Sequence, residues 1–236
     1  FMRLPRPISD HFFLFLADVF PPHKIVNNPL GIRVTSSKAF LLNFPTICPP
    51  MCLCHNIEEV QNFAKQFPIV LKPLENYGGK GIVKVVDGWV IDGNNKIAWT
   101  DYKPVMEEEF QNGGYLAMKF LQNVVQGDKR VIVVNGKVLG ASLRLPPPNS
   151  WMCNVAQGGR SEHSDVDQEE QLIAQVIGPK LKEKGIVMFG FDTLVNDEGK
   201  RVLSEINTLS IGGLPQAEIQ SNIPIVKQAV TGVLAY

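Results

Sequence analysis

The stretch from residue 186 to residue 207, IVMFGFDTLVNDEGKRVLSEIN, carries side chains whose types and spacing suit metal binding. Two β-rich runs flank the turn residues 196–199, which predicts an antiparallel hairpin. If the residues next to this turn pair regularly, Asp192 lies opposite Leu203 and diagonal to Glu205 on one face of the hairpin. The hairpin therefore brings two acidic side chains close to each other.

Asn207 adds a third oxygen ligand to this face, because it follows Glu205 by two positions in the same strand. Diagonal neighbours in a sheet lie roughly 7–8 Å apart, within reach of one shared ion. Two carboxylates and an amide oxygen are hard ligands suited to Mg²⁺. Among apolar residues, unpaired charges are otherwise expensive. The alternative is that the acids are solvated on the exposed side of the hairpin.

Several cations interrupt strand or loop patterns and are candidates to bind an anion: Lys38, Lys72, Arg130, Arg144 and Arg160. Lys72 lies in the apolar run 69–74, directly before the glycine-rich loop ENYGGKG at 75–81. Glycines allow backbone N–H groups to turn toward a phosphate and approach it closely. The alternatives are a solvated strand end for Lys72 and a plain flexible hairpin for the loop.

An Asn-Gly turn at residues 135–136 predicts a second hairpin, because both central positions of such a turn favour a positive φ. In a regular ladder Arg130 stands opposite Ala141, and Arg144 lies three residues beyond that pair. Whether the two arginines converge then depends on the twist of the strands. The alternative is that both are surface arginines on an edge hairpin.

The composition of the 236-residue chain is typical of a globular protein of one large domain or two small ones, with 44% hydrophobic and 19% charged residues. Lys+Arg and Asp+Glu both number 23, so no net charge favours nucleic acid or an anionic membrane. No apolar run approaches the ~20 residues that span a bilayer. We expect neither a nucleic-acid nor a membrane partner.

The four cysteines do not form a strong metal motif. Cys48, Cys52 and Cys54 lack paired C-x₂-C spacing, and Cys153 stands alone. Zinc is the weaker alternative, and free thiols in a reducing cytosol are expected. Cys153 is interpreted as an incidental cysteine in an exposed loop.

The secondary structure is expected to mix helices and strands. Ser9 is expected to cap a helix that ends near residue 20, and Asn56 is expected to cap another. Further helices are expected at 38–42, 106–110, 168–184 and 223–236. Besides the two hairpins, strands are expected at 69–74, 82–86 and 115–121, with weaker signals at 89–91 and 97–99. A loop signal covers residues 27–29, and a long polar loop is expected from 146 to 163.

Several segments, in this order, resemble the ATP-grasp superfamily and, within it, the bacterial glutathione synthetase family. They are IVLKPL through GG at 69–79, GDKRV at 127–131, NVAQGGR at 154–160, IGPKLKEKG at 177–185, and FGFD at 189–192 with SEIN at 204–207. The resemblance implies an α+β fold whose two subdomains grip ATP between antiparallel sheets. It also implies that residues 1–45 are a remnant of a truncated N-terminal domain with a linker helix. Residues 46–236 would then form the ATP-grasp domain, divided near residue 120.

The resemblance also implies roles for particular residues. Those that would bind ATP are Lys38, Lys72, Gly78, Gly79, Met118, Lys119, Phe120, Leu121 and Asp128. Arg130 and Arg144 would face the transferred phosphate and the substrate carboxylate, and Arg160 would lie in a closing loop. Arg3, Ser210 and Gly212 would contact substrate. Asp192, Glu205 and Asn207 would hold Mg²⁺, with Mn²⁺ as the alternative, in agreement with the hairpin argument.

The implied reaction is ATP-driven amide formation through an acyl phosphate, with γ-glutamylcysteine and glycine as substrates, in a cytoplasmic homo-oligomer. Two segments depart from the family pattern, at 146–153 and at 208–213, and both concern substrate recognition more than ATP binding. One alternative is therefore a related ligase that acts on another peptide or protein. Another is a nucleotide-binding fragment without ligase activity.

Overall fold

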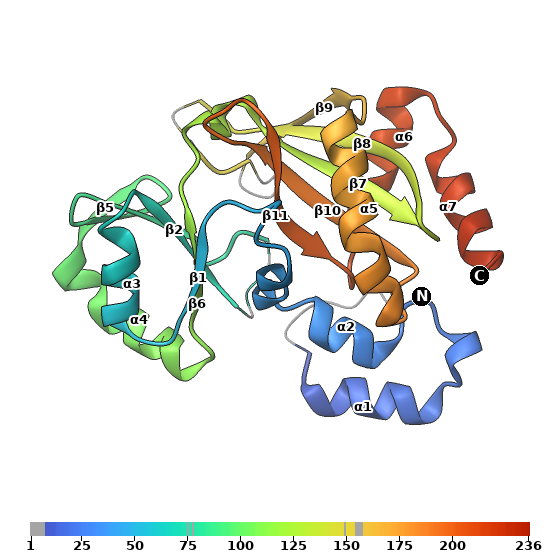
Figure 1. The fold of residues 1–236 in the computed structure, drawn as a ribbon, viewed down its shortest axis with the longest axis horizontal. Helices are drawn as coiled ribbons and strands as arrows, with labels where there is room; N and C mark the ends of the chain where they lie inside the picture. The colour runs from blue at the N-terminus through green and yellow to red at the C-terminus, as the bar shows by residue number, and fades with distance from the viewer. Residues whose placement is uncertain (1–7, 75, 77, 149, 154–157) are drawn as a thin grey trace.

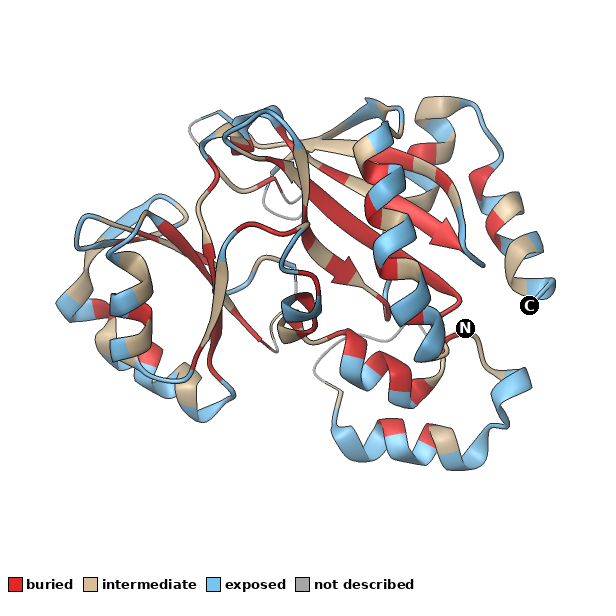
Figure 2. Cartoon of the chain, viewed as in Figure 1, coloured by how far each residue is buried: buried red, intermediate tan, exposed pale blue. Residues whose placement is uncertain are grey.

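A computed structural model describes residues 8–74, 76, 78–148, 150–153 and 158–236 of the chain. Two antiparallel sheets form two lobes, one with six strands in the order β1-β6-β2-β3-β4-β5 and one with five in the order β11-β10-β7-β8-β9 (Figure 1). Helices cover both sheets, and the central strands are buried (Figure 2). The expected α+β architecture with two antiparallel sheets is confirmed.

The six-stranded sheet lies in the smaller lobe. Its strands are β1 (Met51–Cys54), β2 (Ile69–Pro73), β3 (Val83–Val86), β4 (Trp89–Asp92), β5 (Asn95–Ala98) and β6 (Tyr115–Lys119). Helices α3 (Ile57–Ala64) and α4 (Trp99–Gln111) pack on this sheet (Figure 1). The Asn56 side chain caps α3 as expected, by accepting a hydrogen bond from the backbone N–H of Glu59 at 2.9 Å.

Helix α4 is longer than the helix expected at 106–110, and it replaces the end of the strand expected at 97–99. It continues through Pro104, a residue that usually interrupts a helix. Tyr102 and Met106 lie four positions apart, on one helical face, and both are buried in the core of this lobe. Packing against the sheet therefore outweighs the unfavourable proline.

The five-stranded sheet forms the larger lobe. Its strands are β7 (Asp128–Val134), β8 (Lys137–Leu145), β9 (Arg160–Ser164), β10 (Met188–Val195) and β11 (Arg201–Asn207). Helix α5 (Gln168–Glu183) matches the helix expected at 168–184 and packs on one face. Helices α6 (Leu214–Ser221) and α7 (Ile225–Leu234) pack on the other face.

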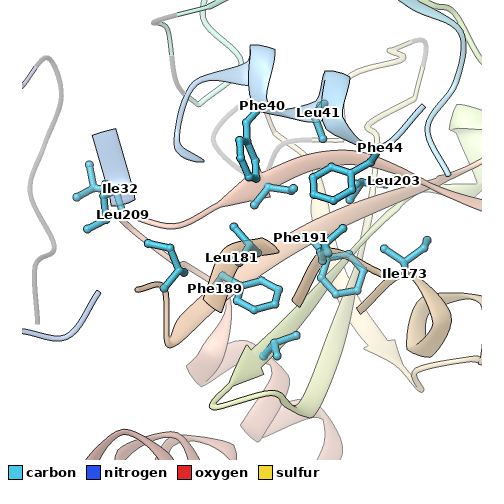
Figure 3. Packing of buried hydrophobic residues seen from close by; sticks show 14 of the residues in the cluster. Ile32, Phe40, Leu41, Phe44, Ile173, Leu181, Phe189, Phe191, Leu203 and Leu209 are labelled. Carbon is cyan, nitrogen blue, oxygen red and sulfur yellow. The ribbon is translucent and has the colours of Figure 1, made fainter. Parts of the chain in front are cut away.

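The N-terminal segment packs into the same core as the five-stranded sheet. It contains α1 (Asp10–Val19), capped by Ser9 as expected, then η1 (Pro22–Lys24), α2 (Pro29–Thr35) and η2 (Lys38–Asn43). The elements η1 and η2 are short 3₁₀ helices, as is η3 (Gln122–Gln126), which directly precedes β7. Figure 3 shows side chains of η2 clustered with those of β10, β11 and α5. This packing fixes η2 beside the edge of the sheet.

Several elements lie where the sequence predicts none, and they include β1, α2, β9 and α6. Helix α2 begins in the Asn-Pro loop signal, because Asn28 caps its N-terminus and Pro29 fits its first turn. Strand β9 lies in the stretch expected to be a polar loop, and it is a polar edge strand without apolar alternation. Helix α6 follows the expected loop at 210–213 directly. Along the described residues, no helix is both long and apolar enough to cross a membrane.

Candidate functional site

The β10–β11 hairpin brings Asp192 and Glu205 closer together than the regular ladder predicts. Val195 pairs with Arg201, so the connecting loop is one residue longer than expected. A register shift next to Asp192 then places it directly opposite Glu205, not opposite Leu203. Directly opposite residues have Cβ atoms about 4.5–5.5 Å apart, and they share one face of the sheet.

The β7–β8 hairpin is also irregular. The pairing of residues next to the Asn-Gly turn is as expected, but a register shift follows between Ile132 and Val133. Arg130 therefore lies opposite Ser142 instead of Ala141, and Arg144 lies opposite Asp128. Asp128 precedes Arg130 by two positions, so both arginines project from the same face.

This face carries a buried cluster of two arginines and two aspartates. Arg130 donates to Asp192 through Nε at 2.7 Å and through a terminal nitrogen at 2.6 Å. Arg144 donates to Asp128 in the same bidentate way, through Nε at 2.5 Å and a terminal nitrogen at 2.8 Å. This terminal nitrogen also lies 2.8 Å from a carboxylate oxygen of Asp192. Asp192 is only 2% exposed. The interpretations of a solvated acid and of surface arginines are wrong.

The cluster holds its two aspartates at very different pKa values. Burial opposes ionisation of Asp192, but the guanidiniums of Arg130 and Arg144 outweigh it and hold the pKa of this carboxyl well below its usual range. Burial raises the pKa of Asp128 to about 6, since Arg144 only partly offsets it and the Asp192 charge adds to it. Of the two aspartates, Asp192 is therefore the one that stays ionised beside the arginines.

Glu205 and Asn207 extend the cluster along β11. In the amide orientation that satisfies both partners, Asn207 donates to Glu205 at 3.3 Å and accepts from Arg130 at 3.0 Å. Within the ranges that the structure describes, no three Asp, Glu, His or Cys side chains are placed to hold a metal. The candidate ligand set therefore depends on the Asn207 amide. With Asp192 and Glu205 it supplies three hard oxygens on one face, which fits Mg²⁺.

A pocket adjoins the cluster between the two sheets. It is lined by Pro49, Val70, Lys72, Ile82, Met118, Lys119, Phe120, Leu121, Val124, Asp128, Trp151, Met152, Cys153, Leu194, Ser204 and Glu205. The structure thus brings together Lys72, the whole segment 118–121, Asp128 and Glu205, as the sequence predicts. The pocket is apolar along most of its wall and charged where it meets the cluster, which suits a ligand with a flat apolar part and an anionic part.

Two lysines connect the lobes. Lys72 of β2 donates to the backbone oxygen of Ser204 in β11 at 3.0 Å. Burial lowers the pKa of Lys72, while the nearby carboxylates of Glu205 and Asp192 act in the opposite direction. Lys38 of η2 is buried and donates to the backbone oxygen of Asn76, in the glycine-rich loop. Both ammonium groups therefore reach across the gap between the sheets.

The other predicted site residues lie outside the pocket lining. Gly78 and Gly79 form the turn between β2 and β3, and both have a positive φ. Arg160 begins β9, where it is exposed and paired with Glu162 at 2.7 Å. Gly212 approaches the cluster, since a Cβ on it would lie 3.8 Å from a terminal nitrogen of Arg130.

The last two predicted residues are Ser210 and Arg3. Ser210 is exposed in the loop after β11. Arg3 lies outside the described residues.

Three consecutive residues of the pocket wall were missed by the sequence reasoning. Trp151 contacts Phe120 edge to face, with ring centroids 6.0 Å apart, and Met152 and Cys153 lie beside it in the lining. Cys153 is buried, so its interpretation as an exposed loop cysteine is wrong. Burial raises the pKa of its thiol to about 12. The available signal was the apolar Trp-Met-Cys run within an otherwise polar loop.

Comparison with known proteins identifies the family. Residues 37–222 match the family described as "Prokaryotic glutathione synthetase, ATP-grasp domain". The chain is 32% identical over 204 residues to the glutathione synthetase of Brucella melitensis biotype 1, a match that covers 86% of this chain and 61% of the relative. It is 30% identical over 213 residues to that of Prochlorococcus marinus strain MIT 9313, covering 89% and 64%. The chain spans about three fifths of the length of these curated relatives.

Solved structures with low sequence identity share the fold. A D-cycloserine synthetase superposes with a TM-score of 0.62 at 14% identity, over 85% of this chain and 71% of that one. D-alanine–D-alanine ligase from Bacillus anthracis, complexed with ATP, gives 0.59 at 16% identity, over 89% and 69%. The fold is therefore the ATP-grasp fold, as the resemblance implied. The chain belongs to the prokaryotic glutathione synthetase family, whose ATP-grasp domain matches its residues 37–222.

Proposed function

We propose that this chain is the ATP-binding and catalytic part of an ATP-dependent carboxylate–amine ligase, namely a glutathione synthetase. The observation that carries the proposal is the buried cluster of Arg130, Arg144 and Asp192 at the charged end of an apolar pocket. ATP combines an apolar base with an anionic triphosphate, and this pocket offers matching surfaces for both parts. The family relationship supports the same assignment.

In this proposal the apolar wall receives adenine, with the segment 118–121 and Phe120 beside the base. Lys72 and Lys38 contact the phosphates by exchanging their present backbone acceptors for phosphate oxygens. The turn at Gly78 and Gly79 covers the phosphates with backbone N–H groups. Asp128 lies at the junction, where it orients Arg144 through two hydrogen bonds.

Asp192, Glu205 and Asn207 would hold Mg²⁺, or Mn²⁺ as the alternative. The ion, when bound, supplies positive charge that balances the triphosphate. Residues of the chain position the reacting groups and supply the remaining positive charge. Arg130 and Arg144 present guanidiniums to the transferring phosphoryl group and to the substrate carboxylate, where bidentate geometry favours both anions.

The proposed reaction has two steps. An oxygen of the substrate carboxylate attacks the γ-phosphorus, and the bond from that phosphorus to the bridging oxygen breaks, which releases ADP. The amine then attacks the acyl carbon of the acyl phosphate, and phosphate leaves with the electron pair of the broken C–O bond and takes up the proton that the amine nitrogen loses. No covalent protein intermediate is needed. Water exclusion by the segments around Trp151 and Arg160 would protect the acyl phosphate from hydrolysis.

The proposed acid is γ-glutamylcysteine and the proposed amine is glycine, as the names of the relatives suggest. Arg3, Ser210 and Gly212 are the proposed substrate contacts, and a Cβ on Gly212 would lie 3.8 Å from a terminal nitrogen of Arg130. A cytoplasmic homo-oligomer and a domain boundary near residue 45 remain predictions. A related ligase with another acid or amine is the second candidate, because the segments 146–153 and 208–213 depart from the family pattern.

The test is ADP release by the protein that contains this chain, with Mg²⁺, ATP, γ-glutamylcysteine and glycine, leaving out each component in turn. ADP formation that requires all components, with glutathione detected by mass spectrometry, supports the proposal. ATP binding without turnover of this pair would leave the nucleotide site and overturn the choice of substrates. Absence of both binding and turnover would overturn the ligase proposal.

The metal ligands are tested with Glu205→Gln, which removes a charge without changing shape. We expect loss of metal-dependent turnover with a retained fold by circular dichroism. Glu107→Gln is the matched control, because Glu107 is exposed on α4 in the smaller lobe. Full activity of Glu205→Gln would contradict the metal assignment.

A further inference from the structure

Strand β11 carries two of the three candidate metal ligands, Glu205 and Asn207, although it is an edge strand. Of the strands in the described part of the chain, it pairs with β10 alone. An edge strand tends to fray at its ends, because half of its backbone groups lack a neighbouring strand. The middle of β11 is held from the outside, where the N–H of Leu203 donates to the Ile47 oxygen at 2.8 Å. Asn207 is the last residue of β11, so the contacts that hold the C-terminal end of this strand determine its position.

Asn27, far away in sequence, holds that end. Its Nδ2 donates to the backbone oxygens of Met188 and Thr208, at 2.6 and 2.8 Å. Its Oδ1 accepts from the N–H groups of Val187 and Met188, at 2.8 and 2.9 Å. The side chain thus joins the first residue of β10 to the residue directly after β11, and it is only 1% exposed.

Thr35 provides a second anchor for the same residue. Its hydroxyl contacts the hydroxyl of Thr208 at 2.9 Å, and it also bonds the backbone oxygen of Gly31 at 2.8 Å, one turn earlier in α2. Both threonines are buried. Asn27 and Thr35 bracket α2, whose N-terminus is capped by Asn28. Asn27 directly precedes the cap of α2 and Thr35 is the last residue of the helix, so contacts from both ends of α2 reach Thr208.

Thr208 begins the loop that returns to the arginine cluster. Cγ2 of Ile211 in this loop would lie 3.2 Å from a Cβ on Gly190, which is near the beginning of β10. A Cβ on Gly213 would lie 3.6 Å from Cδ of Arg130. The loop thus lies against the Arg130 side chain, and Thr208 is its fixed origin.

We propose that Asn27 and Thr35 are positioning residues that fix Asn207 and the loop 208–213 against the arginine cluster. They act through Thr208 and not by contact with metal or substrate. The inference rests on the proposed function in that Asn207 is taken as a metal ligand and the loop as a substrate contact. It predicts that this N-terminal segment governs metal and substrate affinity at a distance, besides its contribution to the core.

The test uses Thr35→Val, which keeps the shape of the side chain and removes its hydroxyl. The probe is Mn²⁺ titrated into the protein with ADP present, measured by calorimetry. We expect Mn²⁺ to bind roughly 2-fold to 10-fold more weakly, the effect of one net hydrogen bond. Thr35→Ser, which keeps the hydroxyl, should restore wild-type affinity. Asn27→Gly removes all four bonds without strain at the φ of 61°, and it should weaken binding further.

The matched control is Thr193→Val. Thr193 is equally buried, and its hydroxyl donates to Glu170 at 2.8 Å, on the sheet face opposite Asp192. It should lower stability without changing Mn²⁺ affinity. Equal effects of the two valine variants on Mn²⁺ affinity, or no effect of either, would overturn the inference.

Hydrogen exchange supplies a readout that does not depend on catalysis or metal. In Thr35→Val the backbone amides of residues 206–213 should exchange faster than in the wild type, whereas in Thr193→Val they should not. If the wild type binds neither Mn²⁺ nor ADP, the proposed function fails, and this comparison still decides the positioning role. Unchanged exchange at 206–213 in Thr35→Val would overturn it.

Discussion

Asp192→Asn should destabilise the protein strongly, because Asp192 balances two buried guanidiniums. The carboxylate accepts three charge-assisted bonds from Arg130 and Arg144, between 2.6 and 2.8 Å. Removing one partner of a buried ion pair costs about 3–5 kcal/mol. Asparagine keeps the shape and one acceptor oxygen but places an amide N–H₂ beside a guanidinium. We therefore expect a loss of about 3–5 kcal/mol in the free energy of unfolding.

The comparison variant is Glu162→Gln. Arg160 and Glu162 lie as close together, at 2.7 Å, but their side chains are 69% and 48% exposed. Exposed pairs contribute about 0–1 kcal/mol. The shortest contacts are similar in length, but Asp192 is buried and accepts from two guanidiniums, so its expected contribution to stability is clearly larger.

The assay is urea denaturation followed by circular dichroism at pH 7 with EDTA, so that no metal contributes. The pKa of Asp192 is lowered by folding, so its stabilisation is present above its ordinary pKa of 3.8 and is lost as the pH falls toward the folded value. The loss in Asp192→Asn should therefore be complete at neutral pH. A loss below about 1 kcal/mol, or one equal to that of Glu162→Gln, would refute the assignment of a buried charge cluster.

Three further predictions concern the same region. Gly127→Ala should lower the free energy of unfolding, measured by urea denaturation, more than Gly136→Ala does. A Cβ at position 127 would lie 2.7 Å from the backbone oxygen of Arg144, whereas no described atom lies within 4 Å of a Cβ at position 136. Equal losses in the two variants would contradict this prediction. Cys153 should resist iodoacetamide at pH 8 until the chain unfolds, since its thiol pKa is about 12, and rapid labelling by mass spectrometry would show otherwise. Asp128 has a pKa raised to about 6, so its stabilising effect at low pH is lost as the pH rises through 6. In the wild type the free energy of unfolding should fall between about pH 4 and pH 6, and Asp128→Asn should make this fall smaller. An unchanged pH profile in the variant would contradict the raised pKa of Asp128.

The elements with strong local signals could be predicted from the sequence. Helix α3 begins after Asn56, and α5 ends before Gly185, whose φ of 69° suits glycine. Both hairpins form around their turn residues. In each case the residues that decide the structure are neighbours in sequence, so a short window contains the necessary information.

Other elements depend on contacts between distant residues, which a sequence window does not contain. Strand β9 has the polar sequence RSEHS, and it is a strand because β8 offers it an edge to pair with. Cys153 is buried because its loop packs over the pocket beside Val124. The role of Asn27 also has no local signal, since its four hydrogen bonds reach residues 160 or more positions away.

The candidate site shows most clearly why register could not be derived from a regular ladder. A shift of one residue moves a strand's side chains to the opposite face. With the observed turn and no irregularity, Arg144 would pair three positions before Arg130 and face away from it. The register shift next to Val133 changes this separation to two positions, so that Arg144 pairs with Asp128 and joins Arg130.

In the β10–β11 hairpin two such deviations compensate each other. The loop is one residue longer than expected, which alone would place Glu205 on the face opposite Asp192. The irregularity next to Asp192 adds a second one-residue shift, which returns Glu205 to that face and moves it from a diagonal to a direct neighbour. The predicted grouping of Asp192, Glu205 and Asn207 was correct although its derivation assumed the wrong pairs. Bulges in both hairpins serve the same arrangement, since each brings a charged side chain onto the face where the cluster forms.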